Sequence, residues 1–369
     1  MIKIRNIAIV CNYALNPNRI GGMDFFYWEL DKQLKLKNYK VTWLFQNGGQ
    51  ITHYEGKNLD FDLVDTQKDF TTTMFSWLKE KKDCNLFIGI FMDYQSTVAK
   101  NIKNQLKIPC VFVDQMSRSK SGKTWFFKMK RIVKGQLYYS KIDAIIAISD
   151  FVKKSIIKES GSRWRNKIQV VYNGLPLENF KIEEKQMVNP SVISIFCIGH
   201  LIHEKGFQTV ISACKILKEN NIPFNLTIAG DGVYKEELLT QATNDLALGS
   251  YQFVGSITNQ AHFLNQADMV IVPSLWEEGF GYTIAEAMLM KKVVFGSKIG
   301  AIPEVLNNEK LLFQAGSSHQ LVELIKDYYN NKEKYEVIAN ELYQRARSNF
   351  TLDIMIEGYM KIIEAQLIK

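Results

Sequence analysis

Cysteine, histidine and long apolar runs are scarce in this sequence, and each scarcity excludes a class of protein. The cysteines are odd in number, scattered, and form no C-x-x-C pair; they are Cys11, Cys84, Cys110, Cys197 and Cys214. This pattern is typical of buried free thiols in a reducing compartment and excludes a disulfide framework. The five histidines lack the spacing of metal ligands, so we expect no metal site.

No stretch approaches the run of about 18 apolar residues that would span a membrane. The apolar residues 7–11 form a segment too short for the hydrophobic region of a signal peptide. We therefore expect a cytoplasmic protein whose contact with a membrane is peripheral.

The overall composition is that of a globular protein. Of its 369 residues 46% are hydrophobic and 23% are charged, which excludes disorder and fibrous architectures. At roughly 100–200 residues per domain, this length predicts two domains of similar size.

Positive charge is concentrated in one block of the chain. The net charge is +8, yet residues 118–167 hold 14 Lys and Arg against three acids, so the other residues sum to −3. Such a basic block suits nucleic acid, an anionic membrane surface or an anionic substrate, and the total charge does not choose among them.

Short β-branched runs alternate with helix-length amphipathic segments throughout, which predicts parallel sheets covered on both faces. In the first half, the predicted strands are 6–10, 41–45, 86–91, 110–113, 144–148 and 168–171, and the predicted helices include 22–37, 96–106 and 124–139. After a polar linker at 178–190, strands are predicted at 192–198, 225–229, 269–272 and 293–295, and helices at 207–219, 234–247, 282–290 and 319–328.

The repeated pattern predicts an α/β protein of two Rossmann-like domains facing across a cleft. We place the first domain at residues 1–177 and the second at 178–349. The closing helical segment, 350–369, is expected to pack back on the first domain.

The most informative stretch runs from residue 268 to 288, where an apolar strand enters a loop with Gly279 and Gly281 before a helix begins. Glycines and a helix N-terminus suit a phosphate group. Glu278 and Glu286 bracket this loop, and an ionised carboxylate can accept two hydrogen bonds from the vicinal diol of a ribose or hexose. The alternatives are a solvated loop charge at Glu278 and a first-turn dipole partner at Glu286.

Glu278 and Glu286 with seven residues between them, Gly279-Phe280-Gly281 inside and Glu-Ala-Met at 286–288, resemble the motif of family 4 retaining glycosyltransferases of the GT-B fold. The resemblance covers nearly the whole chain and is stronger in the second half. Further similar segments are Gly21-Gly22, residues 170–174, residues 199–206 and Gly230-Asp231-Gly232.

This resemblance implies that Glu286 binds the donor ribose, Glu278 the sugar and Lys205 the diphosphate. Lys205 also precedes a predicted helix, where the dipole disfavours a cation unless an anion such as pyrophosphate is bound; a plain surface lysine is the alternative. The implied catalytic residues are Asp114, Lys205 and Glu278. The implied donor-binding residues are Gly21, Gly22, His200, Lys205, Gly230, Glu278, Gly279, Phe280, Gly281 and Glu286.

Two positions depart from the pattern of many relatives. His200 stands where many have arginine, and it is either a weak, pH-dependent donor contact or a packing residue. Asp114 stands where many have a histidine near the sugar, and its candidate role is a polar contact to the acceptor hydroxyl or the reacting sugar. Asp93 competes for that role, and a turn-capping function is the alternative for both.

The resemblance implies transfer of a sugar with retention from a nucleotide-sugar to a lipid-linked saccharide in cell-surface polysaccharide synthesis. A UDP-sugar is the favoured donor and GDP-mannose the alternative, with no metal or cofactor. The competing functions are a nucleotide-sugar epimerase or hydrolase on the same fold, and a non-catalytic adaptor for nucleic acid or membrane.

An aromatic, lysine-rich stripe lies within the basic block on the predicted helix 124–139. Its candidate acceptor or membrane contacts are Trp125, Phe126, Lys128, Lys130 and Arg131. Such a stripe suits an anionic bilayer, so we predict peripheral docking on the inner face of the plasma membrane. The alternative is an ordinary sheet-covering helix, and no nucleic-acid partner is expected because no recognition module is visible.

Overall fold

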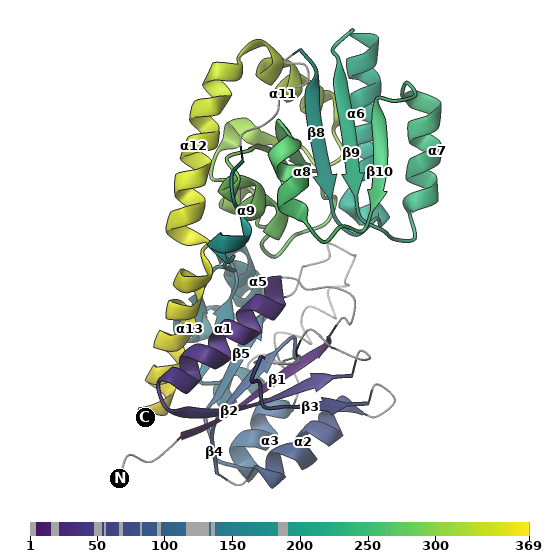
Figure 1. The fold of residues 1–369 in the computed structure, drawn as a ribbon. Coiled ribbons are helices and arrows are strands. Elements are labelled where there is room, and N and C mark those ends of the chain that lie inside the picture. Colours follow the sequence, from purple (N-terminus) through teal and green to yellow (C-terminus); the bar gives the residue numbers. More distant parts are fainter. Residues whose placement is uncertain are drawn as a thin grey trace. The chain divides into compact units, whose positions relative to one another are not determined.

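A computed structural model describes residues 5–15, 22–47, 54, 57–65, 69–81, 83–93, 97–115, 133, 137–183 and 191–368. The chain divides into two compact units (Figure 1). Unit 1 comprises Met1–Met116, Ser121–Gly174 and Leu352–Lys369, and unit 2 comprises Ser117–Lys120 and Leu175–Thr351.

Unit 1 contains a seven-stranded sheet in the order β3-β2-β1-β4-β5-β6-β7. Each neighbouring pair is parallel. The strands carry successive apolar residues because both faces of a parallel sheet are covered, and all five residues of β5 are buried. The strands are β1 Arg5–Ala14, β2 Tyr39–Gln46, β3 Phe61–Val64, β4 Cys84–Ile90, β5 Cys110–Asp114, β6 Ala144–Ala147 and β7 Ile168–Val170.

The last helix of the chain completes the core of unit 1. Helix α13 packs against α1 and β4, beside α1 in Figure 1. The rings of Phe26 and Tyr359 lie 4.7 Å apart, and Gly358 allows the helix to approach Val171 closely. The helices of this unit are α1 Gly22–Leu36, α2 Phe70–Glu80, α3 Val98–Gln105, α5 Asp150–Ser160 and α13 Leu352–Leu367, with short 3-10 turns η2 Tyr139–Lys141 and η3 Ser162–Lys167.

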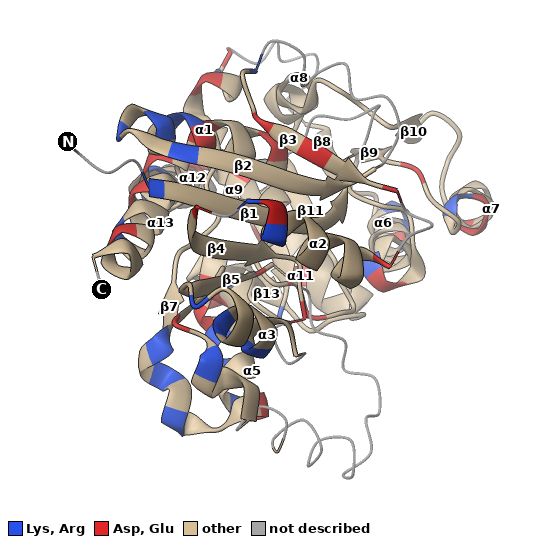
Figure 2. Cartoon of the chain, turned by 90° about the horizontal axis from the view of Figure 1, so that it is seen from below, with Lys and Arg blue, Asp and Glu red and all other residues tan. Residues whose placement is uncertain are grey.

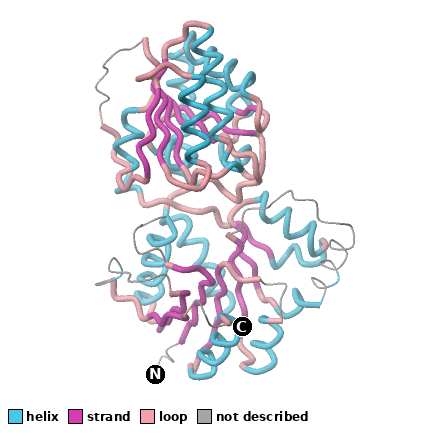
Figure 3. The backbone as a smooth tube through the Cα atoms, turned by 90° about the vertical axis from the view of Figure 1, so that its right-hand side faces the viewer, coloured by secondary structure: helices cyan, strands magenta, loops and turns pink. Residues whose placement is uncertain are grey.

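Unit 2 contains a six-stranded parallel sheet in the order β10-β9-β8-β11-β12-β13, with helices packed around it (Figure 3). The strands are β8 Ile193–Ile198, β9 Phe224–Ala229, β10 Tyr251–Gly255, β11 Met269–Val272, β12 Val293–Ser297 and β13 Leu312–Phe313. The helices are α6 Phe207–Glu219, α7 Lys235–Asp245, α8 Gln260–Gln266, α9 Tyr282–Leu289, α10 Ile302–Leu306, α11 Ser318–Asn330 and α12 Lys332–Asn349, with turns η4 Leu177–Asn179, η5 His203–Lys205 and η6 Glu309–Leu311.

The strand order reverses once in each sheet. In unit 1 the reversal lies between β1 and β4, and in unit 2 it lies between β8 and β11. Doubly wound proteins bind ligands in the crevice outside the carboxyl ends of two such strands. The topology therefore predicts a ligand site at the loops after β8 and β11.

The predicted α/β class with two Rossmann-like parallel sheets is confirmed. The prediction missed β3 and α2, because the four-residue β3 has an acidic residue in its centre and the first turn of α2 contains three threonines, which favour helix weakly. It also missed β10, whose first residues carry hydroxyl and amide groups. Most of the predicted helix 124–139 lies outside the described residues.

Candidate active site

Two loops meet at the point where the strand order of unit 2 reverses. One follows β8 and contains η5, and the other follows β11 and leads into α9. The backbone N–H of Leu275 donates to the carbonyl of Glu204 at 2.8 Å. Gly206 has a φ of +75°, and a side chain there would lie 2.0 Å from the carbonyl oxygen of Pro273. This glycine is therefore required for the close contact of the two loops.

The structure brings Lys205 and Glu278 together across these loops. Lys205 Nζ lies 2.6 Å from Glu278 Oε1, and the side chains are 24% and 10% exposed. Two neutral groups donate to the same oxygen: the hydroxyl of Ser274 at 2.7 Å and the indole N–H of Trp276 at 3.2 Å. Lys205 Nζ also lies 5.4 Å from the centre of the Trp276 ring. The result is a half-enclosed cation and carboxylate at the sheet's carboxyl edge.

The contact with Glu278 gives Lys205 a negatively charged partner within the protein. The residue does end the turn η5, directly before the Gly206 that opens α6, where the helix dipole disfavours a cation. In the structure the carboxylate of Glu278 supplies the compensating negative charge. A bound anion is therefore one of two ways to satisfy Lys205.

The loop after β11 continues into the N-terminus of α9. Gly281 begins the helix with a φ of +92°, a backbone conformation that favours glycine, and Gly279 is buried. Phe280 is 2% exposed, and its ring packs edge-on against the rings of Tyr282 at 5.6 Å and Phe350 at 5.3 Å. The Phe280 side chain thus belongs to the core of unit 2, which leaves only its backbone to face a ligand.

Glu286 lies on α9 beyond its first turn, which contains no acidic residue, so the first-turn dipole interpretation is wrong. The amide of Gln260 donates to Glu286 Oε2 at 2.6 Å and orients this half-buried carboxylate. Burial, and then the negative charge of Glu286, raise the pKa of Tyr282 well above its usual range.

The loops after β8 and β9 also pack closely. A side chain at Gly230, whose φ is +132°, would lie 1.9 Å from the carbonyl oxygen of Gly199. A side chain at Gly232 would lie 2.8 Å from the ring of His200, which is exposed. Asp231 is 64% exposed and lies 3.7 Å from the amine of Lys235. The glycines here serve backbone packing, and His200 sits at the surface of this junction.

In unit 1 the predicted acids occupy different places. Asp114 ends β5 and is 1% exposed, while the next residue, Gln115, exchanges two hydrogen bonds with the buried Asn173 at 3.1 and 3.2 Å. Asp93 is exposed and follows β4, a strand at which the order reverses. Gly22 begins α1, and Gly21 lies outside the described residues. The choice between Asp114 and Asp93 stays a prediction.

The candidate membrane contacts fall outside the described residues, and they are Trp125, Phe126, Lys128, Lys130 and Arg131. Most of the described Lys and Arg residues of the basic block lie on α5 and η3, which carry several blue segments in Figure 2. The exposed members there are Lys154, Lys158, Arg163 and Arg165. Among the described helices, none is both long and apolar enough to cross a membrane.

Sequence reasoning overlooked four residues that shape the site: Ser274, Trp276, Gln260 and Gly300. Ser274 and Trp276 lie inside the motif and could have been flagged as donors near Glu278. Gly300 could not, because its role depends on a contact with a loop 22 positions earlier: a side chain there would lie 2.5 Å from the backbone nitrogen of Glu278. Its φ of +59° independently favours glycine.

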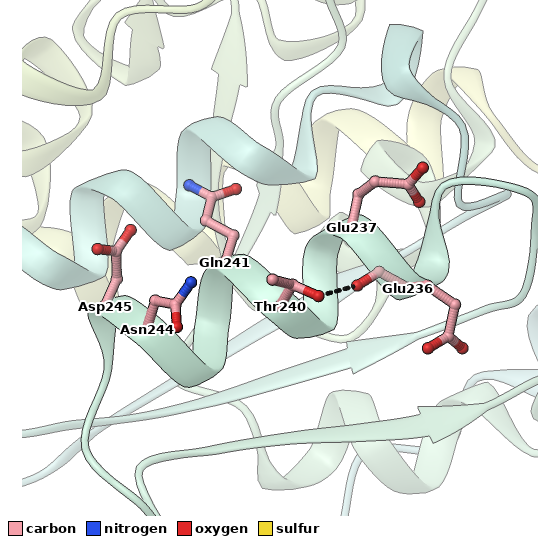
Figure 4. Close-up of a pocket in the computed structure, with 6 residues that line it drawn as sticks. All are labelled: Glu236, Glu237, Thr240, Gln241, Asn244 and Asp245. Atoms are coloured by element: carbon pink, nitrogen blue, oxygen red, sulfur yellow. Dashed lines mark hydrogen bonds between the residues drawn. The ribbon is translucent and has the colours of Figure 1, made fainter.

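A surface hollow on α7 offers no comparable chemistry. It is lined by Glu236, Glu237, Thr240, Gln241, Asn244 and Asp245, and none of these is a candidate site residue (Figure 4). Thr240 donates to its own helix backbone, and Asp245 accepts from Lys215. Within the described residues, no group of three or more His, Cys, Asp or Glu is arranged to bind a metal ion.

The chain is similar to glycosyltransferases of known sequence. Residues 179–345 match the family model described as Glycosyl transferases group 1. The sequence is 25% identical over 277 residues to an uncharacterized glycosyltransferase of Methanocaldococcus jannaschii, covering 73% of this chain and 72% of that protein. These matches support a glycosyltransferase of the GT-B fold.

Solved structures share the fold of this chain. Anabaena HepE in complex with UDP superposes with a TM-score of 0.81 at 17% identity, covering 98% of this chain and all of that one. Other HepE structures hold UDP and glucose, or UDP-glucose. The lipopolysaccharide outer core galactosyltransferase WaaB superposes with a TM-score of 0.73 at 16% identity, over 98% of this chain and 99% of its own.

Proposed function

We propose that this glycosyltransferase transfers a sugar from a UDP-sugar, with retention of anomeric configuration, to a hydroxyl of a lipid-linked saccharide in cell-surface polysaccharide synthesis. The observation that carries the proposal is the Lys205–Glu278 pair at the carboxyl edge of β8 and β11, next to the N-terminus of α9. The UDP and UDP-glucose complexes of HepE support the nucleotide. WaaB supports the saccharide acceptor.

In the proposed reaction the bond between the anomeric carbon and the diphosphate oxygen breaks, and its electron pair leaves with UDP. The acceptor oxygen bonds to the same face of that carbon, and its proton passes to the departing phosphate oxygen. Lys205 and the N-terminus of α9 stabilise the charge that develops on the diphosphate, which is why neither a metal ion nor a cofactor is required in this proposal.

The two carboxylates bind hydroxyl groups in this mechanism. Glu286, oriented by Gln260, accepts hydrogen bonds from the ribose diol, and Glu278 accepts them from the sugar. Asp114 holds the acceptor hydroxyl, with Asp93 as the competing residue. The protein thus acts by orientation and charge stabilisation.

The acceptor side is proposed to dock on the inner face of the plasma membrane. The lysines and arginines of α5 and η3 support this, because they belong to the basic block and several of them are exposed to solvent (Figure 2). Binding to liposomes should rise with anionic lipid content and fall with salt. Binding that responds to neither would contradict membrane docking and favour a water-soluble acceptor.

The donor proposal is tested by incubating the protein with individual UDP-sugars and GDP-mannose and following nucleoside diphosphate release with and without lipid-linked acceptor. Acceptor-dependent release from a UDP-sugar supports a transferase, whereas release or sugar isomerisation without acceptor would indicate a hydrolase or epimerase. Glu286→Ala should abolish donor binding. The matched control is Glu357→Ala, which removes an exposed carboxylate paired with Lys361 in unit 1.

A further inference from the structure

The two oxygens of the Glu278 carboxylate have different surroundings. Oε1 accepts from Lys205 Nζ at 2.6 Å, from Ser274 Oγ at 2.7 Å and from Trp276 Nε1 at 3.2 Å. No described residue donates a hydrogen bond to Oε2. One oxygen is saturated with donors, and the other keeps its capacity to accept from a ligand.

The backbone that carries this arrangement is fixed from a second direction. The carbonyl of Glu278 accepts from the N–H of Ala301 at 2.9 Å, and Gly300 lies against the same peptide. The hydroxyl of Ser297, at the end of β12, donates to the carbonyl of Ser274 at 2.7 Å. Because Ser274 is 1% exposed, its hydroxyl has little freedom to find another acceptor.

The three donors to Oε1 are not equivalent. Lys205 is a flexible cation at the end of a short turn, and a diphosphate would attract it away from a single carboxylate. Ser274 and Trp276 are neutral and lie on the same loop as Glu278, so a nearby phosphate attracts them less strongly than it attracts the lysine cation. If Lys205 moved to a phosphate, these two would still donate to the carboxylate of Glu278. That side chain is only 10% exposed, so its charge would be costly to leave unpaired.

We propose that Ser274 and Trp276 are positioning residues that anchor Glu278 by Oε1 and present Oε2 to hydroxyl groups of the donor sugar, while Lys205 is the exchangeable partner that transfers to the diphosphate. This inference rests on the proposed function and names the residues that orient its sugar-binding carboxylate.

The test compares Ser274→Ala and Trp276→Phe with wild type and with Ser160→Ala. The control removes an equally buried serine whose hydroxyl donates to a backbone carbonyl at 2.7 Å in α5 of unit 1. The probes are UDP-glucose, UDP-galactose and UDP-N-acetylglucosamine in turnover assays, and UDP alone in calorimetry. UDP lacks the transferred sugar, so its affinity reports the nucleotide site alone.

Losing one hydrogen bond to the carboxylate should lower kcat/KM by about 10- to 100-fold for each variant. Affinity for UDP should stay within about twofold of wild type, since the nucleotide contacts are untouched, and Ser160→Ala should match wild type in both assays. A merely structural role would instead weaken UDP binding as much as turnover, because the whole loop would shift.

A double-mutant cycle tests whether the effect passes through Glu278. In a Glu278→Ala background, Ser274→Ala and Trp276→Phe should change turnover by less than about twofold, because the group they orient is gone. Full, additive losses there, or wild-type kcat/KM in the single variants, would overturn the positioning roles while leaving the proposed function intact. If the wild-type protein turns over no nucleotide sugar, the proposed function fails and these roles fail with it.

Discussion

The carboxyl edges of the two sheets satisfy their polar groups in different ways. In unit 2, the loops after β8 and β11 hold a cation and a carboxylate, and the described donors to this carboxylate all bind one of its two oxygens. In unit 1, the described polar groups near the end of β1 are satisfied locally: Cys11 pairs with the hydroxyl of Tyr27 at 3.2 Å, and Tyr54 donates to Asp24 at 2.8 Å. The same topology therefore supports a charged centre in one unit and a network of mostly neutral groups in the other.

Burial explains much of this difference. Burial raises the pKa of the Cys11 thiol to about 12, so the thiol stays neutral and behaves as a core residue. Glu278 is also nearly buried, but three donors compensate its charge. Two of these donors come from the loop of Glu278 itself and the third, Lys205, comes from the loop after β8. The glycines at 206 and 300 permit the close approach of the neighbouring loops.

The largest expected effect comes from removing the cation of unit 2. Lys205→Ala should lower turnover of a UDP-sugar by about 10²- to 10³-fold, the usual loss when one preorganised charge-stabilising group is deleted. Steady-state kinetics measures it. The matched control is Lys215→Ala, which breaks a 2.8 Å ion pair with Asp245 elsewhere in the same unit, and equal losses in both variants would contradict the assignment.

Adding a methyl group at Gly300 tests whether loop packing maintains the Glu278 centre. At Gly249, with a φ of +86° and no atom within 4 Å, alanine adds only the strain of a left-handed conformation, about 1–2 kcal/mol. At Gly300 the methyl also overlaps the Glu278 backbone, so Gly300→Ala should lose roughly 1–3 kcal/mol more. Denaturant unfolding compares the two, and only Gly300→Ala should also lose turnover.

A smaller loss of stability is expected from a substitution in unit 1 that leaves the donor site of unit 2 unchanged. Ser149 caps α5 by accepting from the N–H of Val152 at 3.1 Å, so Ser149→Ala should destabilise the protein by about 1 kcal/mol. Calorimetry measures the loss. Because the change lies in unit 1, affinity for UDP should not change, and a weakened UDP affinity would show that α5 influences the donor site.

The smallest effects are expected at two carboxylates whose contributions to the stability of the fold depend on pH in opposite directions. Burial raises the pKa of Asp31 in unit 1, so its ionisation destabilises the fold as pH rises above its ordinary 3.8. A hydrogen bond from Lys334 lowers the pKa of Asp327 in unit 2, so its charge stabilises the fold above 3.8 and that contribution is lost as pH falls through the lowered value. Near pH 7, Asp31→Asn should therefore raise the melting temperature and Asp327→Asn should lower it.

Each substitution should change the free energy of unfolding by less than about 1 kcal/mol. Asp327 is largely solvated, and Asp31→Asn also removes an ion pair with Lys35. These changes should shrink toward zero as the pH falls well below 3.8, where the carboxyls are protonated in both folded and unfolded chains. A melting-temperature difference that persists unchanged to pH 2.5 would contradict the linkage.

The sequence alone was sufficient to predict the parallel α/β class, most strands and the glycine loop that joins the strand at 269–272 to the helix that begins at 282, because apolar periodicity and glycine placement are local properties. The pairing of Lys205 with Glu278 was not predictable, since it joins residues 73 positions apart and depends on which strand lies beside β8. The sequence treated the two as contacts to separate parts of a ligand.

What the sequence by itself determined is therefore the inventory: two sheet-forming series, a loop rich in glycine and carboxylates, and a basic block. Only the tertiary structure decided which oxygen of Glu278 accepts from protein donors, which side chains donate to it and that Phe280 faces the core. The physical reason is that donor geometry and close packing are set by loops from strands that adjoin in space but not in sequence.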